Sequence, residues 1–317
     1  MIKFIAIIKF EKLMTYTRKE FLQNTAILLT AAMTSSNFAF GKEKPLLAFS
    51  TLGCPDWSFQ QIVDFAAANG YSGLEIRGIK RQMDLPKCDE FSSPERIKTT
   101  LSLMKEKGLK FINLGASANM HFHEGPEKEK SIAEAKSFID LAQKINCPFV
   151  RVFPNKFPKD RDRNQTISTV AENLLTLGEY AKERNVTVLL ETHGDFSGSD
   201  DILKVMKAAS HPNIALVWDI ANMWTVTKES PKEVYKKLKK YIRHTHLKDA
   251  KIQGDKLQYV LIGQGDVPIF EAIDILYKDG YKGYYSFEWE KLWHPEIAEP
   301  EIALADFPNA MKKHFSN

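Results

Sequence analysis

Short apolar runs alternate with longer helix-like stretches along the chain from residue 46 onward. Each apolar run has the length of a β-strand, and polar residues gather where the runs end. Strands that alternate regularly with helices are typical of βα units and a parallel sheet. Eight runs occur, and they predict eight strands: LLAFST, SGLEIRG, KFINLGA, FVRVFP, VTVLLE, IALVWD, IRHTHL and YYSFEW.

The stretches between the strands carry the start and stop signals of helices. Ser93-Pro94 and Ser230-Pro231 each offer a capping serine followed by proline, with an acidic residue in the first turn. Glycine and asparagine tolerate the left-handed conformation that ends a helix. Such residues precede five of the runs, at Asn69-Gly70, Gly108, Asn146, Asn185 and Gly280. Helices are therefore predicted over residues 57–69, 94–107, 127–145, 166–184, 200–209, 231–240 and 268–279, and from about residue 300.

Two topologies accommodate eight βα units, an open doubly wound sheet and a closed barrel. The open sheet is expected to carry a Gly-rich phosphate-binding turn after its first strand, and the segment TLGCPDW is not one. A closed barrel also explains why polar residues cluster at the strand ends. No linker rich in Pro, Gly or Ser divides residues 46–317. The sequence therefore predicts an α/β fold, a single-domain (β/α)8 TIM barrel over residues 42–317.

Residues 1–41 differ in character from the rest of the chain. Basic residues come first, the apolar stretch AILLTAAM follows, and small and polar residues come last, which is the order of an export signal peptide. The apolar part is much shorter than the roughly 20 residues of a membrane span. The segment TRKEFL resembles a twin-arginine motif in which Lys19 replaces the second arginine, and Met14 is an alternative start. We expect an exported protein, periplasmic or extracellular, without a membrane span after signal removal. An amphipathic helix retained on the barrel is the alternative.

The predicted signal accounts for most of the net charge. Residues 1–41 hold five Lys or Arg and two acidic residues, a net charge of +3, against +4 for the whole chain. Subtracting them from the 44 basic and 40 acidic residues of the chain leaves 39 and 38. A nearly neutral barrel gives no support to nucleic-acid binding. The three cysteines have no metal-type spacing, and we assign them no chemistry.

Four side chains of metal-ligand type stand at the ends of predicted strands. Glu191 ends VTVLLE, Asp219 ends IALVWD, His246 lies in IRHTHL and Glu288 lies in YYSFEW. In a barrel these strand ends open at one mouth, where carboxylates would repel one another without a cation. Three carboxylates and one imidazole suit Mn²⁺, with Mg²⁺, Co²⁺ or Zn²⁺ as alternatives. The set is a poor structural zinc site, which would prefer thiolates.

Each of these residues has a simpler interpretation when considered alone. Glu191 could pair with an arginine inside the barrel, and Asp219 could cap the helix that follows it. His244 could be a core histidine with a satisfied ring. Glu288 and Glu290 alternate along one segment, so only the one at the barrel rim needs to be functional. The metal-site hypothesis depends on all four residues meeting at one mouth.

Several motifs together resemble a known family: ETHGDF, VWDIANMW, HTHLKD, the loop Gly263-Gln264-Gly265-Asp266, and YYSFEWE. They are similar to motifs of the xylose isomerase-like TIM barrels, the sugar phosphate isomerases and epimerases, and the resemblance covers most of residues 46–310. It implies one divalent metal held by Glu191, Asp219, His246 and Glu288, and an isomerase, epimerase or dehydratase acting on a sugar, sugar phosphate or cyclitol.

The chain departs from the family pattern at one position. Epimerases of this group often carry a histidine three residues after the strand-6 aspartate, and this chain has Asn222 there. The substrate contact or supporting role that this histidine has in the family is therefore not carried over to Asn222. The DNA-repair endonucleases that share the fold need more histidines at several strand ends, so that function is not expected.

From these residues we predict a divalent-metal-dependent sugar isomerase or epimerase. One catalytic glutamate, Glu191 or Glu288, removes the proton next to a carbonyl, a metal-stabilised enediolate forms, and the other glutamate returns a proton. Return to the opposite face of the same carbon gives epimerisation, and return to the neighbouring carbon gives isomerisation. Arg151 and Glu75 could also pair with each other. The predicted substrate-binding residues are His193, Lys248, Arg151, Glu75 and Trp224.

Two other functions remain open. A lyase or dehydratase acting on keto sugars or keto-glycosides begins with the same proton removal. A sugar-binding barrel without catalysis is the alternative of a different class, and the four intact metal-type residues argue against it. An exported enzyme meets free sugars and glycosides more often than phosphorylated intermediates. We therefore expect an unphosphorylated small-molecule sugar as the partner, and homo-oligomerisation stays open.

Overall fold

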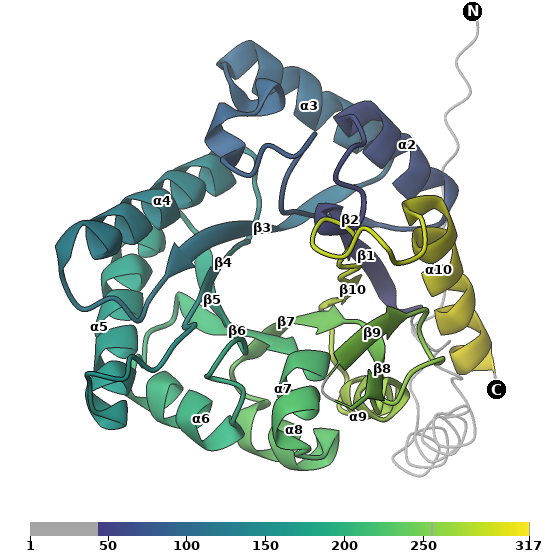
Figure 1. The fold of residues 1–317 in the computed structure, drawn as a ribbon. Helices are drawn as coiled ribbons and strands as arrows, with labels where there is room; N and C mark the ends of the chain where they lie inside the picture. Colours follow the sequence, from purple (N-terminus) through teal and green to yellow (C-terminus); the bar gives the residue numbers. More distant parts are fainter. Residues whose placement is uncertain (1–43, 255, 317) are drawn as a thin grey trace, which may run out of the picture. The chain divides into compact units, whose positions relative to one another are not determined.

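Eight parallel strands close into a barrel in the computed structural model of the protein (Figure 1). The strands are β1 (Leu46–Ser50), β2 (Gly73–Ile76), β3 (Lys110–Asn119), β4 (Phe149–Phe153), β5 (Thr187–Glu191), β6 (Ile214–Asp219), β7 (Ile242–Leu247) and β10 (Tyr284–Phe287). Around the barrel they follow the order β1, β10, β7, β6, β5, β4, β3, β2. Each predicted strand is present, and the TIM-barrel prediction is confirmed.

The barrel lies within the compact unit Pro45–Asn317. The structure describes residues 44–254 and 256–316. The predicted export signal, residues 1–41, lies outside the described residues and stays a prediction. Within the described part of the chain, no helix is long and apolar enough to cross a membrane.

A ring of helices surrounds the strands (Figure 1). The predicted helices correspond to α2 (Phe59–Ala68), α3 (Pro94–Glu106), α4 (Gly125–Lys144), α5 (Arg163–Lys182), α6 (Ser199–Ala208), α8 (Pro231–Leu238), α9 (Ile269–Lys278) and α10 (Pro300–Ser316). Ser93 and Ser230 cap α3 and α8 as predicted, since each side chain accepts a backbone N–H three residues on. The five predicted stop positions all have positive φ, at Gly70, Gly108, Asn146, Asn185 and Gly280.

The structure adds elements that the apolar pattern did not predict. Helix α7 (Ile220–Thr227) follows β6 directly, and an antiparallel hairpin of β8 (Asp249–Gln253) and β9 (Lys256–Val260) follows β7. Short 3₁₀ turns complete the loops, η1 (Thr51–Gly53), η2 (Leu85–Lys87) and η3 (Asp89–Phe91). Helix α7 and the hairpin follow the carboxyl ends of the neighbouring parallel strands β6 and β7, so they lie at the same end of the barrel. Figure 1 shows α7 beside β7. These additions therefore belong to the rim of the predicted site.

One buried carboxylate, Asp249, closes the base of the hairpin. Its two oxygens accept backbone N–H groups from Ala250, Gly263, Gly265 and Val267 at 2.9 to 3.2 Å. A Cβ on Gly265 would lie 2.1 Å from Asp249 Oδ1, so only glycine allows this approach. The GxGD motif seen in the sequence is thus the cradle of a structural carboxylate.

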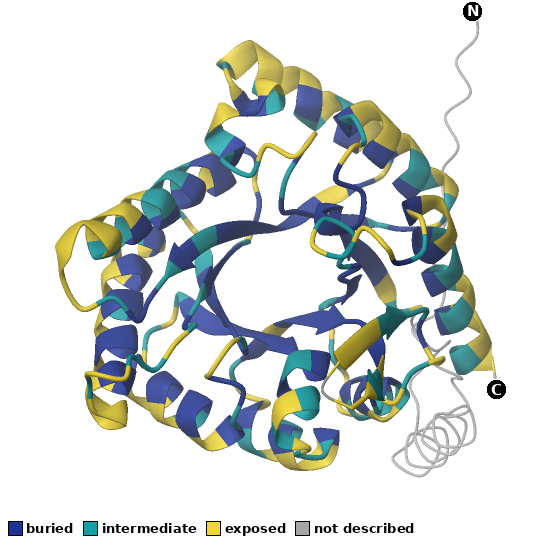
Figure 2. Ribbon diagram, in the orientation of Figure 1, coloured by how far each residue is buried: buried dark blue, intermediate teal, exposed yellow. Residues whose placement is uncertain are grey.

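The barrel strands are largely buried (Figure 2), and apolar side chains form two clusters around them. The larger core lies between the strands and the helices, where the outward-facing strand residues pack against the apolar stripes of the helices. A smaller apolar cluster, Leu189, Ala215 and Val217 with Phe149, lies on the other side of the strands. Since side chains alternate along a strand, Leu189 shares the inward face of Glu191. Inside the barrel, the polar side chains at the strand ends therefore lie next to a layer of apolar side chains.

Candidate metal centre

The four predicted metal ligands converge inside the mouth of the barrel. Glu191 and Asp219 are the last residues of β5 and β6, His246 lies in β7, and Glu288 directly follows β10. Asp219 and His246 are partners in the register of β6 and β7. All four side chains are buried, and one ligand-type atom from each lies within 4.8 Å of the others. The sequence prediction of a shared site agrees with this geometry.

Several polar atoms of the cluster have no hydrogen-bond partner. His246 Nδ1 lies 3.3 Å from Glu288 Oε1, 3.6 Å from Glu191 Oε1 and 3.9 Å from Asp219 Oδ2. His246 Nδ1, Asp219 Oδ2 and Glu191 Oε2 are all buried without a hydrogen bond, although the two carboxylate oxygens face the charges of Lys248 and Arg151. A buried polar group left unpaired costs free energy. Oxygen and imidazole donors facing one point are the donor set of a divalent cation, so these residues fit a bound metal ion.

Asp219 serves two purposes with its two oxygens. Oδ1 accepts the backbone N–H of Asn222 at 2.8 Å and caps α7, whereas Oδ2 faces the cluster. The capping interpretation and the ligand interpretation from the sequence are therefore compatible. Asn222 takes part through its backbone N–H.

Two cations are packed directly against the carboxylates. Lys248 Nζ lies 2.8 Å from Asp219 Oδ2, 2.6 Å from Glu288 Oε2 and 2.7 Å from Glu290 Oε1. Arg151 Nε lies 2.9 Å from Glu191 Oε2, an ion pair without hydrogen-bond alignment, and its Nη1 donates to the Ala116 carbonyl. Both cations are buried. They hold the carboxylates apart from one another and partly neutralise them.

The electrostatics of the cluster differ from residue to residue. Burial raises the pKa of Asp219 to about 7, even though Lys248 opposes the shift. Burial also disfavours the ionised form of Glu288, but His246 and Lys248 hold the pKa of Glu288 well below its ordinary value. Arg151 and His246 likewise lower the pKa of Glu191 against the effect of burial. Glu191 and Glu288 are therefore ionised at neutral pH, as a proton acceptor must be.

A second polar cluster lies directly against the first. His244 Nε2 lies 2.7 Å from Glu75 Oε2, and His246 Nε2 lies 3.0 Å from both oxygens of Glu75. Glu75 is fully buried on β2. The alternative in which Glu75 pairs with Arg151 is wrong, because Arg151 pairs with Glu191 and Glu75 with the two histidines. This placement also does not favour the substrate contact predicted for Glu75, since its oxygens already face imidazole rings.

His193 follows the end of β5 and is held by a chain of amides. Asn155 Oδ1 lies 3.0 Å from His193 Nδ1, and Asn155 Nδ2 donates to Asn119 Oδ1. Asn155 has a positive φ of 65°, a conformation in which asparagine is common. Burial lowers the pKa of His193, so its ring is neutral at neutral pH. A neutral imidazole beside Glu191 suits hydrogen bonding to a sugar hydroxyl, and the predicted substrate contact stays a prediction.

Three tryptophans, Trp57, Trp224 and Trp289, differ in their surroundings, and Trp224 is the one predicted to contact a substrate. Trp224 lies half-buried on α7 with Lys228 Nζ 3.9 Å above its ring, a position near the rim. Trp289 is buried, and its indole N–H donates to the Ala298 carbonyl, so it packs rather than meeting a ligand. Trp57 packs against Phe65. Trp224 is partly exposed, as a sugar-stacking residue needs to be, and its predicted substrate contact stays a prediction.

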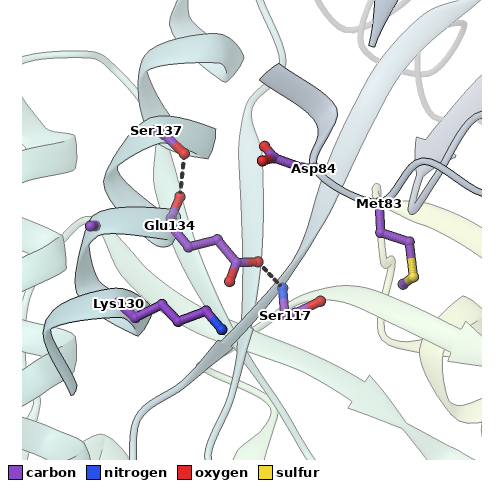
Figure 3. A pocket seen from close by; sticks show the side chains of 7 residues that line it. Met83, Asp84, Ser117, Lys130, Glu134 and Ser137 are labelled. Atoms are coloured by element: carbon purple, nitrogen blue, oxygen red, sulfur yellow. Dashed lines mark hydrogen bonds between the residues drawn. The ribbon is translucent and has the colours of Figure 1, made fainter. Parts of the chain in front are cut away.

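A separate cleft of about 530 Å³ lies beside α4 (Figure 3). Glu134 of α4 accepts the backbone N–H of Ser117 on β3 at 2.6 Å, which ties the helix to the end of the strand. The cleft is lined by Met83, Asp84, Ser117, Lys130, Ala133, Glu134 and Ser137. None of the predicted metal or substrate residues is among them, and we assign the cleft no part in the chemistry.

Comparison with protein families agrees with the fold and the site. Residues 63–307 match the model of the family described as xylose isomerase-like TIM barrel. The chain belongs to this family. The resemblance stated from the sequence motifs is therefore confirmed. Members of the family similar to this chain are enzymes, and they include both epimerases and dehydratases.

Three curated relatives illustrate this range. The chain is 26% identical to a 3-dehydroshikimate dehydratase of Bacillus anthracis over 68% of its own length and 78% of the relative. It is 22% identical to an inosose dehydratase of Clostridium perfringens, over 77% and 85% of the two chains. It is 24% identical to a fructoselysine 3-epimerase of Shigella flexneri, over 70% and 82%. The chain is thus an enzyme of a sugar-acting family, in which the reaction varies.

Solved structures show the same fold. The probable 3-DHS dehydratase from Bacillus anthracis superposes with a TM-score of 0.70 at 19% identity, covering 84% of this chain and 98% of the other. A xylose isomerase-like TIM barrel protein from Mycobacterium smegmatis, solved in complex with magnesium, gives a TM-score of 0.64 at 17% identity, covering 86% and 97%. At these identities the likeness concerns the fold alone.

Proposed function

We propose that the protein is a divalent-metal-dependent isomerase or epimerase of an uncharged keto sugar. The observation that carries this proposal is the pair of ionised glutamates facing the metal site, Glu191 and Glu288. They come from β5 and the end of β10, three positions apart around the barrel, so they approach the site from different sides. One removes a proton next to the carbonyl, and the other, after taking up a proton from water, delivers it to the resulting carbanion.

Glu191, Asp219, His246 and Glu288 would hold the metal. A divalent ion bound there supplies Lewis-acid polarisation of the substrate carbonyl. Lys248 keeps Glu288 ionised and oriented through its 2.6 Å contact with Oε2, which leaves Oε1 directed at the centre. Arg151 fixes Glu191 in the same way. These contacts prepare both glutamates for proton transfer without reorganisation.

The charges around the site support an uncharged substrate. Lys248 contacts Asp219, Glu288 and Glu290, and Arg151 contacts Glu191, so both cations are already paired with protein carboxylates. A neutral sugar or cyclitol needs no further cation, whereas a phosphate or carboxylate would bring another negative charge next to these carboxylates.

A dehydratase is the second candidate, favoured by the similarity to two dehydratases. It shares the proton removal next to a carbonyl but then expels a hydroxyl group from the neighbouring carbon. The neutral ring of His193, held by Asn155 beside Glu191, is a group that could assist this departure after taking up a proton. The two candidates therefore differ in the second step.

Proton NMR in D₂O distinguishes these functions. The metal-loaded protein is incubated with neutral keto sugars, inososes and 3-keto-glycosides, and with 3-dehydroshikimate as an anionic comparison. Exchange of one carbon-bound proton for deuterium, with an epimer or isomer as product, supports the first proposal. An unsaturated product identifies a dehydratase. If no neutral substrate exchanges a proton for deuterium while the anionic substrate is turned over, the proposal of an uncharged substrate is wrong.

We also propose that the protein is exported. The support is the order of basic, apolar and small residues in positions 1–41, which is that of a signal peptide. Export favours free sugars and glycosides as substrates over phosphorylated intermediates. Cell fractionation, with mass spectrometry of the mature N-terminus, tests the proposal. A full-length protein found only in the cytoplasm would contradict it.

A further inference from the structure

Glu75 contacts the Nε2 side of the His246 ring, whereas the Nδ1 side faces the candidate metal site. Both of its oxygens lie 3.0 Å from His246 Nε2, and Oε2 also lies 2.7 Å from His244 Nε2. All three side chains are at most 1% exposed. Ser286 Oγ approaches the same Oε2 at 3.5 Å. The carboxylate is therefore enclosed by groups that can donate a proton.

We propose that Glu75 is a positioning residue that fixes the tautomer and the ring plane of His246 for metal binding. This inference rests on the metal-dependent function proposed above. An ionised carboxylate only accepts hydrogen bonds, so His246 Nε2 must carry the proton in the contact with Glu75. In the neutral ring, Nδ1 then keeps its lone pair and faces Glu191, Asp219 and Glu288.

The fold explains why this contact comes from a distant part of the sequence. Glu75 lies on β2 and His246 on β7, and β1 and β10 stand between these strands in the barrel wall. The contact therefore crosses the interior of the barrel instead of running along the wall. His244 and His246 share the inward face of β7, so one carboxylate can hold both rings. The pair of rings meets nearly at right angles, at 82°.

The same three residues could alternatively be a second metal site, since Glu75, His244 and His246 form a group of metal-ligand type. The distances favour hydrogen bonds. The Nε2 atoms lie 2.7 to 3.0 Å from the Glu75 oxygens, within the ordinary range for N–H donors. Metal-bound histidines commonly donate their other ring N–H to a carboxylate in this way. We therefore interpret the contacts of Glu75 with His244 and His246 as N–H hydrogen bonds and not as ligands of a second metal ion.

NMR of the wild-type protein tests the tautomer directly. Metal-free protein labelled with ¹⁵N in its histidines is examined by long-range ¹H–¹⁵N correlation, at a pH where the His246 ring is neutral. The His246 signals are assigned by their loss from a His246→Gln protein. We expect a protonated Nε2 and an unprotonated Nδ1. A ring protonated at Nδ1 would overturn the proposal.

Mn²⁺ titration of Glu75→Gln provides the second test, with free Mn²⁺ counted by electron paramagnetic resonance. Loss of an orienting carboxylate typically weakens metal binding about 10–100-fold. We expect that loss, with one ion per chain at saturation in both proteins. Asp201→Asn is the matched control, since Asp201 is a buried carboxylate that pairs with Arg163 on the helices instead. Its affinity should equal that of the wild type.

The outcomes separate this inference from the proposed function. Wild-type affinity in Glu75→Gln, or a second Mn²⁺ ion that this variant loses, would overturn the positioning role. A wild-type protein that binds no Mn²⁺ or Mg²⁺ would overturn the metal-dependent function instead. The tautomer measurement on metal-free protein would still decide what Glu75 does to His246.

Discussion

The two polar clusters inside the barrel share His246 but differ in how their atoms are paired. In the cluster of Glu191, Asp219 and Glu288, His246 Nδ1 is buried without a hydrogen bond, and Asp219 Oδ2 and Glu191 Oε2 have only the ion pairs with Lys248 and Arg151. In the cluster of Glu75 and His244, the carboxylate oxygens and the facing ring nitrogens satisfy one another. Atoms without hydrogen bonds at the mouth, and hydrogen-bonded atoms beside them, distinguish a ligand-binding layer from a supporting layer.

Removing a ligand from the mouth should have the largest effect. Asp219→Asn and Asp219→Ala should both lose the metal and nearly all activity, because the carboxylate oxygen facing the site disappears. Only Asp219→Ala should also lose the helix cap, at about 1 kcal/mol of stability, because asparagine can still cap α7. Elemental analysis and denaturant unfolding of both metal-free proteins measure the two effects. Full metal content in either variant would refute the assignment of Asp219.

Glu288→Gln should separate holding the metal from moving the proton. We expect turnover to fall by about 10²–10⁴-fold, the usual contribution of a positioned acid or base. Glutamine keeps an oxygen for the ion, so metal should still bind, though more weakly. Solvent-deuterium exchange and Mn²⁺ titration report on these two properties. Undiminished exchange in a metal-loaded Glu288→Gln protein would exclude Glu288 as a proton carrier, and Glu290→Gln serves as the neighbouring control.

Lys248→Met should show how much the stability of the protein depends on a positive charge beside the carboxylates of the site. The methionine fills similar space but leaves Asp219, Glu288 and Glu290 without their shared positive partner. Breaking a buried ion pair from one side typically costs about 3–5 kcal/mol. We expect that loss of stability without metal and substantial recovery in saturating Mg²⁺. Equal loss with and without Mg²⁺ would show that the lysine and the ion do not share the same carboxylates.

The smallest of these effects concerns pH. Asp219, with its pKa raised to about 7 by burial, is largely protonated below that pH in the metal-free protein, so a metal ion must displace its proton. The neighbouring carboxylates raise the pKa of His246 well above its usual value, against the effect of burial, so its proton must leave too. Affinity for Mg²⁺ should therefore rise with pH and change more steeply below pH 7 than above it. Calorimetric titrations between pH 5.5 and 8.5 would contradict this if they gave one constant affinity.

Much of the fold and most of the mouth could be predicted from the sequence. The four ligand candidates each end or closely follow an apolar run, and strand ends in a barrel must meet. The role of Glu75 could not be predicted, because its partners lie about 170 residues later in the chain. One signal was available. Glu75 stands between Leu74 and Ile76, whose outward packing turns the carboxylate into the barrel.

The rim was harder to predict for a different reason. The β8–β9 hairpin lacks a buried face of its own, so its residues show no apolar period that marks strands. Helix α7 begins at Ile220, directly after Asp219 ends β6, and no loop signal separates the two. Asn155 adopts its left-handed conformation within a loop, where tertiary contacts rather than local pattern decide the backbone.

Because Asp249 fixes the two ends of the β8–β9 hairpin, this part of the rim can vary independently of the barrel. Asp249 accepts four backbone N–H groups, one from the start of the β8–β9 hairpin and three from the segment that follows it. The two ends of the hairpin are therefore fixed to each other, whatever residues lie between them. The tip can lengthen, shorten or change composition while Lys248, one residue before this anchor, stays against the carboxylates. Evolution or design can thus alter which molecules reach the mouth without rebuilding the chemistry beneath it.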